Sequence, residues 1–413
     1  MRFLSLTTTA FVSSTGSMRK PHDSSTAFPL VPPAVVMTEL SPPTFSSVMQ
    51  QPQSVVNIAI QDWLTVVVPP AFAADASPPT PKEIALLREA LGSFYGVDRD
   101  LVKSEALLTQ AIDAWQRQPP DEQAALYRVR GDCYLAELKP QEAEKDYTIA
   151  INFLEGPGGE LADKEELPAA LLGRARAIRS EGVVSKEKSL KASRDYQKSL
   201  SLSSREEWDT DEELFEDGAS RNPYATWECG MELRAAGLYD QAYQVHMLAA
   251  DSFADIADKA RSIICSLDAG IDLAAAGKTE QAKKVLKDAI DSTTKAEARD
   301  VELLQRVIAK EGEARIALAS ILWDNKERGA AEAQLGEACS RLDQLDADAT
   351  ARNAKLGRKP ELAPPRLKFS IDDGLGAFDL SCTRFKNEKF LTETLQWPDE
   401  LKTKVIKLEN LGK

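Results

Sequence analysis

Apolar residues recur from position 82 onward at intervals of three and four, the spacing of one helix face, and strand-like alternation appears only after position 366. Within this stretch a frame of small and large residues repeats. Its clearest copy consists of Gly131, Tyr134, Ala143, Tyr147 and Ala150. Two antiparallel helices can cross closely only where side chains are small, and large residues fill the space beside each crossing. The frame therefore predicts a series of packed helix pairs.

Other copies keep the twelve-residue offset between the first two small positions, except for one copy that needs a longer turn between its helices. The regular copies are Gly92, Tyr95, Ser104, Leu108 and Ala111; Gly230, Leu233, Ala242, His246 and Ala249; Gly270, Leu273, Ala282, Leu286 and Ala289; and Ala319, Leu322, Ala331, Leu335 and Ala338. The copy with the longer turn consists of Gly173, Ala192, Tyr196 and Ser199.

The turns between paired helices carry their own signals. Gly237 and Gly277 each stand five residues before a small residue of a second helix, where a left-handed residue after the first helix is expected. Asp240 and Thr279 follow as expected N-caps of the second helices, because their side-chain oxygens can accept from free backbone N–H groups.

This frame resembles that of the tetratricopeptide repeat family over about residues 85–345, with six candidate repeats spaced 39 to 57 residues apart. The resemblance implies an all-α fold, a right-handed superhelix of antiparallel helix pairs spanning residues 82–345. In this family the first helices of successive repeats line a concave groove that binds other proteins. The matching groove positions here are Arg128, Asp132, Arg174, Tyr224, Trp227, Met231, Arg234, Leu267 and Ile271.

Aromatic, Met and Arg side chains are the types that anchor protein interfaces. For Trp227 the alternative is that it only fills the core between repeats. Family members that serve Hsp70 and Hsp90 hold a terminal carboxylate with Lys, Asn and Arg. That clamp is not expected here, because the matching positions are Glu89, Ser93, Val129, Leu167 and Leu171.

Two regions depart from the frame. Residues 205–217 are mostly acidic and include Trp208. A run of charges predicts a solvated loop; the alternative is an acidic lid or a contact for a basic partner. After the array, residues 346–365 read as a helix extension and a linker that Pro364 and Pro365 break. Residues 366–413 read as a cap over the end of the array, with a hairpin pairing 366–371 with 377–382 and closing helices within 390–411; a separate binding module is the alternative.

Residues 1–73 have the composition of a targeting presequence, expected to be disordered: they are rich in Ser, Thr and Pro and poor in acids. An apolar run, 64–73, ends in Ala71-Phe72-Ala73, which predicts cleavage after Ala73. Polar residues before this run argue against a membrane anchor. The leader resembles the bipartite presequences of thylakoid-lumen proteins, and Ala10-Phe11 and Ala27-Phe28 resemble the junction found in diatom-type plastid preproteins.

Composition narrows the chemistry. The net charge of −14 makes nucleic acid an unlikely class of partner. Outside the leader the only histidine is His246, which stands at a large, inward position of the frame, so we expect it to pack rather than to catalyse. We also expect no metal site, cofactor or phosphate-binding loop. The five cysteines show no Cys-x-x-Cys pair and fit neither a zinc site nor a disulfide framework, so we expect core thiols.

The sequence therefore predicts a non-enzymatic protein-binding scaffold. Its leader predicts the thylakoid lumen of a plastid, where the partners would be subunits of photosynthetic membrane complexes that it helps to assemble or stabilise. The alternative is a regulatory or thiol-redox-linked soluble protein of the stroma or cytosol with an uncleaved leader.

Overall fold

The computed structural model describes residues 78–96, 98–159, 162, 164–182, 185–204, 210–296, 301–355 and 381–408. Throughout these residues the regular elements are helices, and none of them forms a strand. The helices follow one another as pairs, and we call the earlier member of each pair its first helix. The pairs are α3 (Pro81–Tyr95) with α4 (Leu101–Trp115), α5 (Pro120–Ala136) with α6 (Pro140–Glu155), α7 (Glu166–Ser180) with α8 (Lys186–Leu202), α10 (Pro223–Ala235) with α11 (Tyr239–Asp255), α12 (Lys259–Ala275) with α13 (Thr279–Thr293), and α14 (Val301–Asp324) with α15 (Arg328–Lys355).

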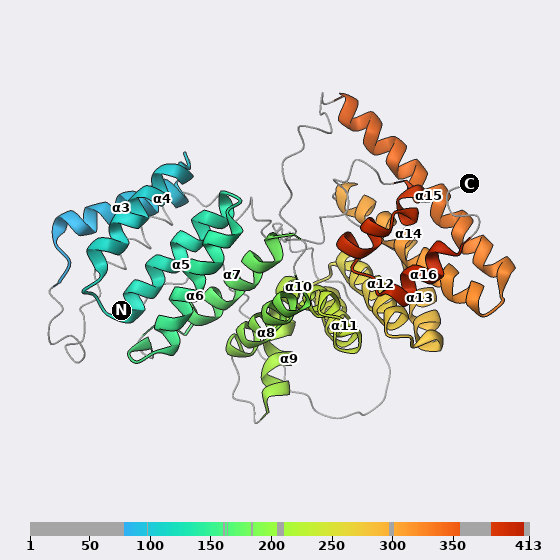
Figure 1. Ribbon diagram of the computed structural model, residues 1–413, viewed down its shortest axis with the longest axis horizontal. Coiled ribbons are helices and arrows are strands. Elements are labelled where there is room, and N and C mark those ends of the chain that lie inside the picture. Colours follow the sequence, from blue (N-terminus) through green and yellow to red (C-terminus); the bar gives the residue numbers. More distant parts are fainter. Residues whose placement is uncertain are drawn as a thin grey trace, which may run out of the picture.

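The pairs are stacked in chain order along the longest axis of the molecule, from α3 at one end to α15 at the other (Figure 1). Each helix packs against its partner, and each pair packs against the pair that follows it. The hydrophobic core runs between the helices as a chain of apolar clusters rather than as one central mass. The all-α, repeat-like architecture expected from the sequence is confirmed.

Close crossings occur where the frame places its small residues. A Cβ added to Gly131 would lie 3.0 Å from the ring of Tyr147. A Cβ on Gly230 would lie 2.5 Å from the imidazole of His246, the side chain at the same frame position as Tyr147. Both large side chains are buried. Glycine is needed at these points because any side chain would push the paired helices apart.

The third pair shows that the expected register was wrong there. Arg130 forms two hydrogen bonds with Asp146 of its partner helix, 2.6 and 2.9 Å long. Arg174 forms the same bidentate contact with Asp195 of α8, at 2.7 and 2.7 Å. Arg174 is therefore the counterpart of Arg130, and it points toward its own second helix rather than into a groove.

The small residue of the third crossing shifts accordingly. Ala175 follows Arg174 as Gly131 follows Arg130, and it is buried in one cluster with Tyr196. Gly173 instead lies against Tyr147 of the preceding pair, where an added Cβ would be 2.3 Å from the ring. The sequence frame placed the small residue of this crossing two positions too early, because Gly173, a glycine required by a different contact, stands close to the expected position.

The turn glycines behave as expected, whereas the predicted caps do not. Gly237 and Gly277 have φ angles of 83° and 74°, the left-handed region in which a Cβ is unfavourable. However, α11 begins one residue before Asp240, and Thr279 is the first residue of α13 rather than its cap. The Asp240 carboxylate pairs with Lys278 of the next turn at 2.9 Å, so it links adjacent pairs instead of capping a helix.

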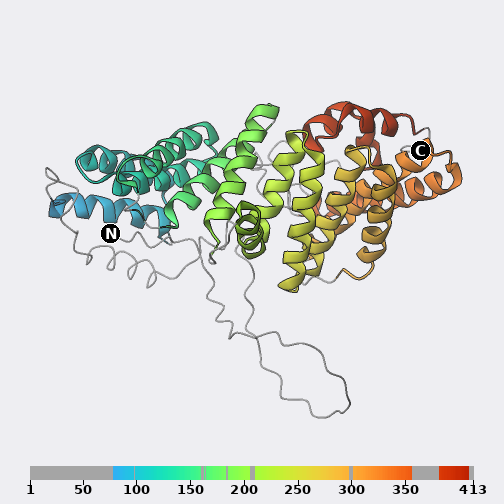
Figure 2. The ribbon, with the colours of Figure 1, turned by 90° about the horizontal axis from the view of Figure 1, so that it is seen from below.

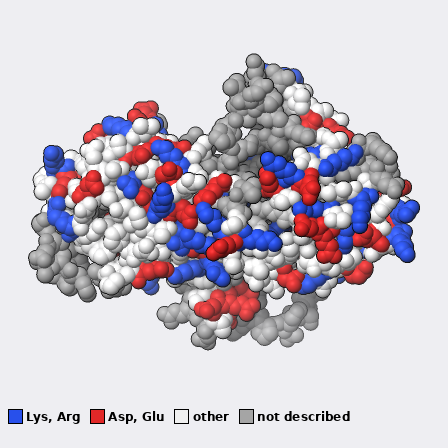
Figure 3. All heavy atoms as spheres, in the orientation of Figure 1, with Lys and Arg blue, Asp and Glu red and all other residues white. Residues whose placement is uncertain are grey.

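The acidic connection forms a helix where a loop was expected. Residues from 211 onward belong to α9 (Asp211–Arg221), and the Thr210 side chain accepts a hydrogen bond from the backbone N–H of Glu213 at 3.2 Å, which starts the helix. Phe215 packs on the α8–α10 cluster. Asp211, Glu212, Glu213 and Glu216 of α9 are exposed and form an acidic patch on the surface (Figure 3). Residues 205–209, with Trp208, lie outside the described residues.

Beyond the array, α15 continues to Lys355. The rest of the linker, the hairpin residues 366–380 and the leader 1–73 lie outside the described residues. The structure continues as η4 (Cys382–Lys386), η5 (Phe390–Thr394) and α16 (Asp399–Ile406). Among the described helices, none has the length and apolarity needed to cross a bilayer.

The expectation of no disulfide was wrong. Cys339 of α15 and Cys382, which opens η4, form a disulfide bond across 43 positions of sequence. Sequence spacing gave no sign of the bond, because the folded C-terminal segment brings the two residues together. The other three thiols, Cys133, Cys229 and Cys265, are buried, as expected of core residues.

Candidate functional site

A ladder of ion pairs links consecutive first helices. We call the surface that these helices build the first-helix face. At three successive junctions a cation of the earlier helix meets an anion of the later one. The ladder consists of Arg128–Glu166, Arg176–Glu228, Arg179–Glu232, Arg234–Asp268, Arg234–Asp272 and, reversed in polarity, Lys310–Asp268.

The α5–α7 junction is centred on Arg128, whose Nε lies 2.7 Å from Glu166 and whose Nη1 lies 3.0 Å from Asp132. The Tyr147 hydroxyl donates to the second oxygen of Asp132 at 2.5 Å. Burial raises the pKa of Asp132 despite the neighbouring guanidinium. The contacts fix the rotamers of all four side chains, so this junction serves packing geometry.

The α7–α10 junction uses two arginines that the sequence frame missed. Arg176 lies 2.9 Å from Glu228, and Arg179 lies 3.7 Å from Glu232. The Arg179 guanidinium also stacks over the Trp227 ring, 5.2 Å from its centroid. Trp227 is thus held between two first helices.

The α10–α12 junction is the most buried part of the ladder. Arg234 lies 2.5 Å from Asp272 and 2.8 Å from Asp268. The indole N–H of Trp227 donates to Asp268 at 3.1 Å. The Nδ1 atom of His246 lies 2.5 Å from the remaining oxygen of Asp272. Because all five side chains are nearly inaccessible to solvent, this network fixes the position of α12 against α10.

Lys310 of α14 completes the network from the other side, with Nζ 3.3 Å from Asp268 and 2.7 Å from Glu313. Burial alone would raise the pKa of Asp268, but Lys310 and Arg234 together hold it well below its usual range. Burial opposes the charge of Lys310, yet Asp268 and Glu313 raise the pKa of its ammonium. The carboxylate and the ammonium are therefore both charged at neutral pH.

The nine predicted groove residues occupy unequal environments. Five are buried: Arg128, Trp227, Arg234, Leu267 and Ile271. Asp132, Arg174, Tyr224 and Met231 are half-buried, and Arg174 is directed at α8. For Trp227 the structure favours the alternative that it fills the core between pairs. Charge pairing and packing between first helices account for the buried arginines, so these side chains do not form an open wall.

Leu267 and Ile271 are buried together with the C-terminal segment, which we define as residues 381–408. Its helix α16 packs on α14 and α12, and η4 packs on α15. Figure 2 shows the segment lying along one side of the array, across these helices. The segment contributes a row of buried apolar side chains to the same core as Leu267 and Ile271. They are Phe385, Leu391, Leu395, Trp397, Leu401, Val405 and Leu408.

Polar contacts fix the two ends of the C-terminal segment. At its beginning, the backbone N–H of Cys382 donates to Asp343 of α15 at 2.9 Å, and Arg384 lies 3.9 Å from Glu313 of α14. Toward its end, Lys404 lies 3.2 Å from Asp324, where α14 finishes. The segment therefore does more than cover the end of the array: its helix α16 lies on the first helices of the last two pairs, and η4 lies on α15.

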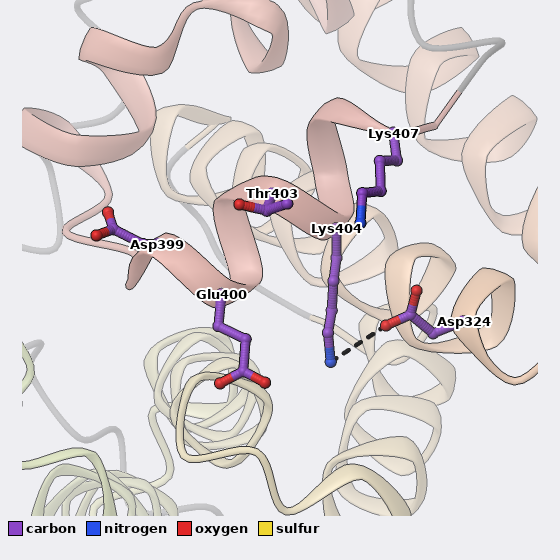
Figure 4. A pocket seen from close by; sticks show the side chains of 6 residues that line it. All are labelled: Asp324, Asp399, Glu400, Thr403, Lys404 and Lys407. Carbon is purple, nitrogen blue, oxygen red and sulfur yellow. Dashed lines mark ion pairs between the residues drawn. The ribbon is translucent and has the colours of Figure 1, made fainter.

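A shallow pocket of 320 Å³ lies at this second anchor (Figure 4). It is open to solvent and its charged groups are of both signs, with Lys404 and Asp324 paired to each other across it. Its lining residues are Asp324, Asp399, Glu400, Thr403, Lys404 and Lys407. The pocket marks the edge of the docked segment, and we assign it no ligand.

His246, the one histidine outside the leader, packs as expected. It is fully buried, and its ring lies against Gly230 while Nδ1 contacts Asp272. Within the described part of the chain, no group of three or more His, Cys, Asp or Glu side chains is arranged to hold a metal ion.

The chain matches no protein-family model and no curated protein. What can be said of its function therefore depends on its own residues.

Sequence reasoning missed most of the ladder and the docked segment. Arg179 and Arg234 each stand four residues after the small residue of their first helix, once the register of the third pair is corrected. A cation at that position with an acid on the next first helix occurs at the α7–α10 and α10–α12 junctions, and is the signal that the sequence offers for them. Docking of the C-terminal segment left no comparable signal, because its aromatic and apolar residues fit an end cap equally well.

Proposed function

We propose that this chain is a tetratricopeptide-type scaffold that binds other proteins through its first-helix face. The proposal includes the six-repeat, right-handed superhelix that the sequence frame implies. It also includes a role in the thylakoid lumen, where the partners are subunits of photosynthetic complexes during assembly or stabilisation. Neither catalysis nor a cofactor is part of this role.

One observation carries the proposal: the first-helix face already holds a polypeptide. Helix α16 lies on α12 and α14, and η4 lies on α15. Phe385 and Trp397 are buried, and Arg384 and Lys404 lie beside Glu313 and Asp324. An amphipathic helix that lays its apolar face into a hydrophobic groove is a recurring mode of peptide recognition. A face that binds one such segment has the chemistry to bind another.

The ladder supports the proposal because it holds the first helices at a fixed spacing. Buried ion pairs add little net stability, but they penalise wrong arrangements, because shifting one helix leaves charges unpaired. Contacts such as Arg234–Asp272 therefore favour one spacing of the first helices. A fixed surface loses less conformational entropy when a partner binds.

The lumenal location depends on the sequence of residues 1–73. Its test is the N-terminus of the protein purified from its native membranes. We expect it to begin at Ala74, after the Ala71-Phe72-Ala73 triplet. A mature protein that begins near residue 28 would place it in the stroma instead, and would leave the binding role untouched.

The binding role is tested by site-specific photo-crosslinking in intact thylakoids, followed by mass spectrometry. A photoreactive residue at Met231, half-buried on first helix α10, should capture a partner subunit. The matched control places it at Gln244, exposed on second helix α11 of the same pair. Equal capture at both positions, or capture at Gln244 alone, would contradict binding through the first-helix face.

A further inference from the structure

The C-terminal segment is fastened by a covalent bond at one end only. The Cys339–Cys382 disulfide lies at its start, where η4 meets α15. From there to Leu408 the segment is held by burial of its apolar side chains and by ion pairs with α14. The disulfide is therefore the covalent restraint on the start of the segment, and without it only non-covalent contacts hold that part on the array.

We propose that the surface of α12 and α14 beneath residues 381–408 is a redox-gated docking site for an amphipathic helical peptide with an aromatic anchor and flanking basic residues. The proposal rests on the protein-binding role proposed above and specifies its partner and its control. With the disulfide intact, the chain's own segment occupies the site. Reduction frees the start of the segment, and a partner peptide of the same chemistry replaces it.

The site defines this partner by complementarity. The surface under the segment is apolar: Trp397 and the other buried apolar side chains of the segment belong to one hydrophobic cluster with residues of α12 and α14. Its margin offers carboxylates to the cations of the segment: Glu313, which also pairs with Lys310, faces Arg384. Asp324 at the far end faces Lys404 in the same way. An aromatic side chain flanked by cations satisfies both features, whereas an acidic peptide would meet like charges.

The aromatic anchor is supported by the packing of the resident segment. Phe385 packs edge-on to Phe390, with ring centroids 5.5 Å apart, and lies 6.1 Å from Trp397. The Arg384 guanidinium stacks over both phenylalanine rings, at 5.2 and 5.1 Å. These side chains form one compact anchor, and the disulfide lies three residues before Phe385. Loss of the bond therefore acts on the anchor directly.

The redox step is a thiol–disulfide exchange. A dithiol reductant attacks the Cys339–Cys382 bond, is itself oxidised to a disulfide, and transfers two electrons and two protons, which leaves two thiols. A disulfide that closes a loop of this length favours the docked state of the segment over the undocked state by roughly thirty- to a thousand-fold. The reduced segment stays tethered through residues 356–380 and still competes with a partner, so the net gain in partner affinity is smaller.

The test measures binding of a fluorescein-labelled synthetic peptide of residues 382–408, with serine in place of the cysteine, to the full chain. We expect the oxidised protein to bind it at least tenfold more weakly than the protein reduced with dithiothreitol. The Cys339→Ser/Cys382→Ser variant should bind as the reduced protein does, with no response to dithiothreitol. That absence of response excludes an effect of the reductant on the three buried thiols.

A second variant keeps the disulfide and weakens the anchor. Phe385→Ala/Trp397→Ala in the oxidised protein should admit the peptide without reductant, because the resident segment is then the poorer ligand. Equal affinity in the oxidised and reduced wild-type protein, or no binding to either variant, would overturn the proposal. Partner capture at Met231 would still support the binding role in that case, so failure of the gate and failure of the binding role are distinguishable.

Discussion

Arg234 on α10 and Asp272 on α12 form an ion pair with 2.5 Å between Nε and Oδ1, and both side chains are almost completely buried. They belong to different helix pairs, 38 positions apart in sequence. The contact therefore does not stabilise either helix by itself. It fixes the distance between the consecutive first helices α10 and α12, the second of which also contacts α16 of the C-terminal segment.

Replacing Arg234 with methionine should destabilise the protein by about 3–5 kcal/mol, because two buried carboxylates then lose their shared cation. Chemical or thermal unfolding followed by circular dichroism measures the loss. The matched control is Arg221→Met, which breaks a pair with Asp217 at an arginine that is 37% exposed and should cost less than about 1 kcal/mol. A similar loss of unfolding free energy in the two variants would show that the buried ion pair stabilises the fold no more than an exposed one does.

The Asp268 network predicts a particular dependence of stability on pH. Its carboxyl has a pKa well below the ordinary value, so its contribution to stability is fully present above the unfolded-state pKa of about 3.9 and is lost as pH falls below it. The difference in thermal midpoint between wild type and Asp268→Asn should be constant from pH 7 to pH 5 and should narrow below about pH 4. A difference that widens on acidification would contradict the assigned direction.

Gly173 provides a test of the corrected register. An alanine there would place its Cβ 2.3 Å from the Tyr147 ring, so Gly173→Ala should cost about 1–3 kcal/mol by overpacking. Gly336→Ala is the control, since Gly336 lies in α15 with open space around it and should gain up to about 1 kcal/mol from helix propensity. Thermal midpoints that move in the same direction in both variants would count against close approach at Gly173.

The reactivity of the three buried thiols distinguishes a structural role of these cysteines from a redox role. Burial raises the pKa of Cys133 to about 11, and it raises the pKa values of Cys229 and Cys265 as well. Iodoacetamide at pH 8 should therefore leave all three unlabelled in the folded protein. It should add three labels after unfolding and five after unfolding with reductant, which intact mass spectrometry resolves. Fast labelling of a buried thiol in the folded protein would support the redox alternative.

The sequence predicted the helix pairs because their determinants are local. A small residue such as Gly131 and a large one such as Tyr147 recur at fixed offsets, and Gly237 marks a turn that few other residues can form. The same reasoning failed where one residue type, such as glycine, can be required by either of two different helix contacts. Gly173 fitted the frame although its close neighbour belongs to the preceding pair.

The candidate site was less predictable because long-range contacts determine it. Trp227 and Arg234 were assigned to an open groove by position, but their partners Asp268 and Asp272 belong to the next first helix, and pairing with them removes both side chains from solvent. The Cys339–Cys382 bond was missed for the same reason. No spacing rule describes a contact that depends on where the C-terminal segment docks.

The central claim is that the first-helix face of the last pairs holds residues 381–408 as it would hold a bound peptide. Amide hydrogen exchange, compared between the intact wild-type chain and its Phe385→Ala/Trp397→Ala variant, tests this most directly. We predict faster exchange in α12, α14 and the C-terminal segment of the variant, with α3 to α8 unchanged. Unchanged exchange in α12 and α14, or a uniform increase along the whole array, would contradict the claim.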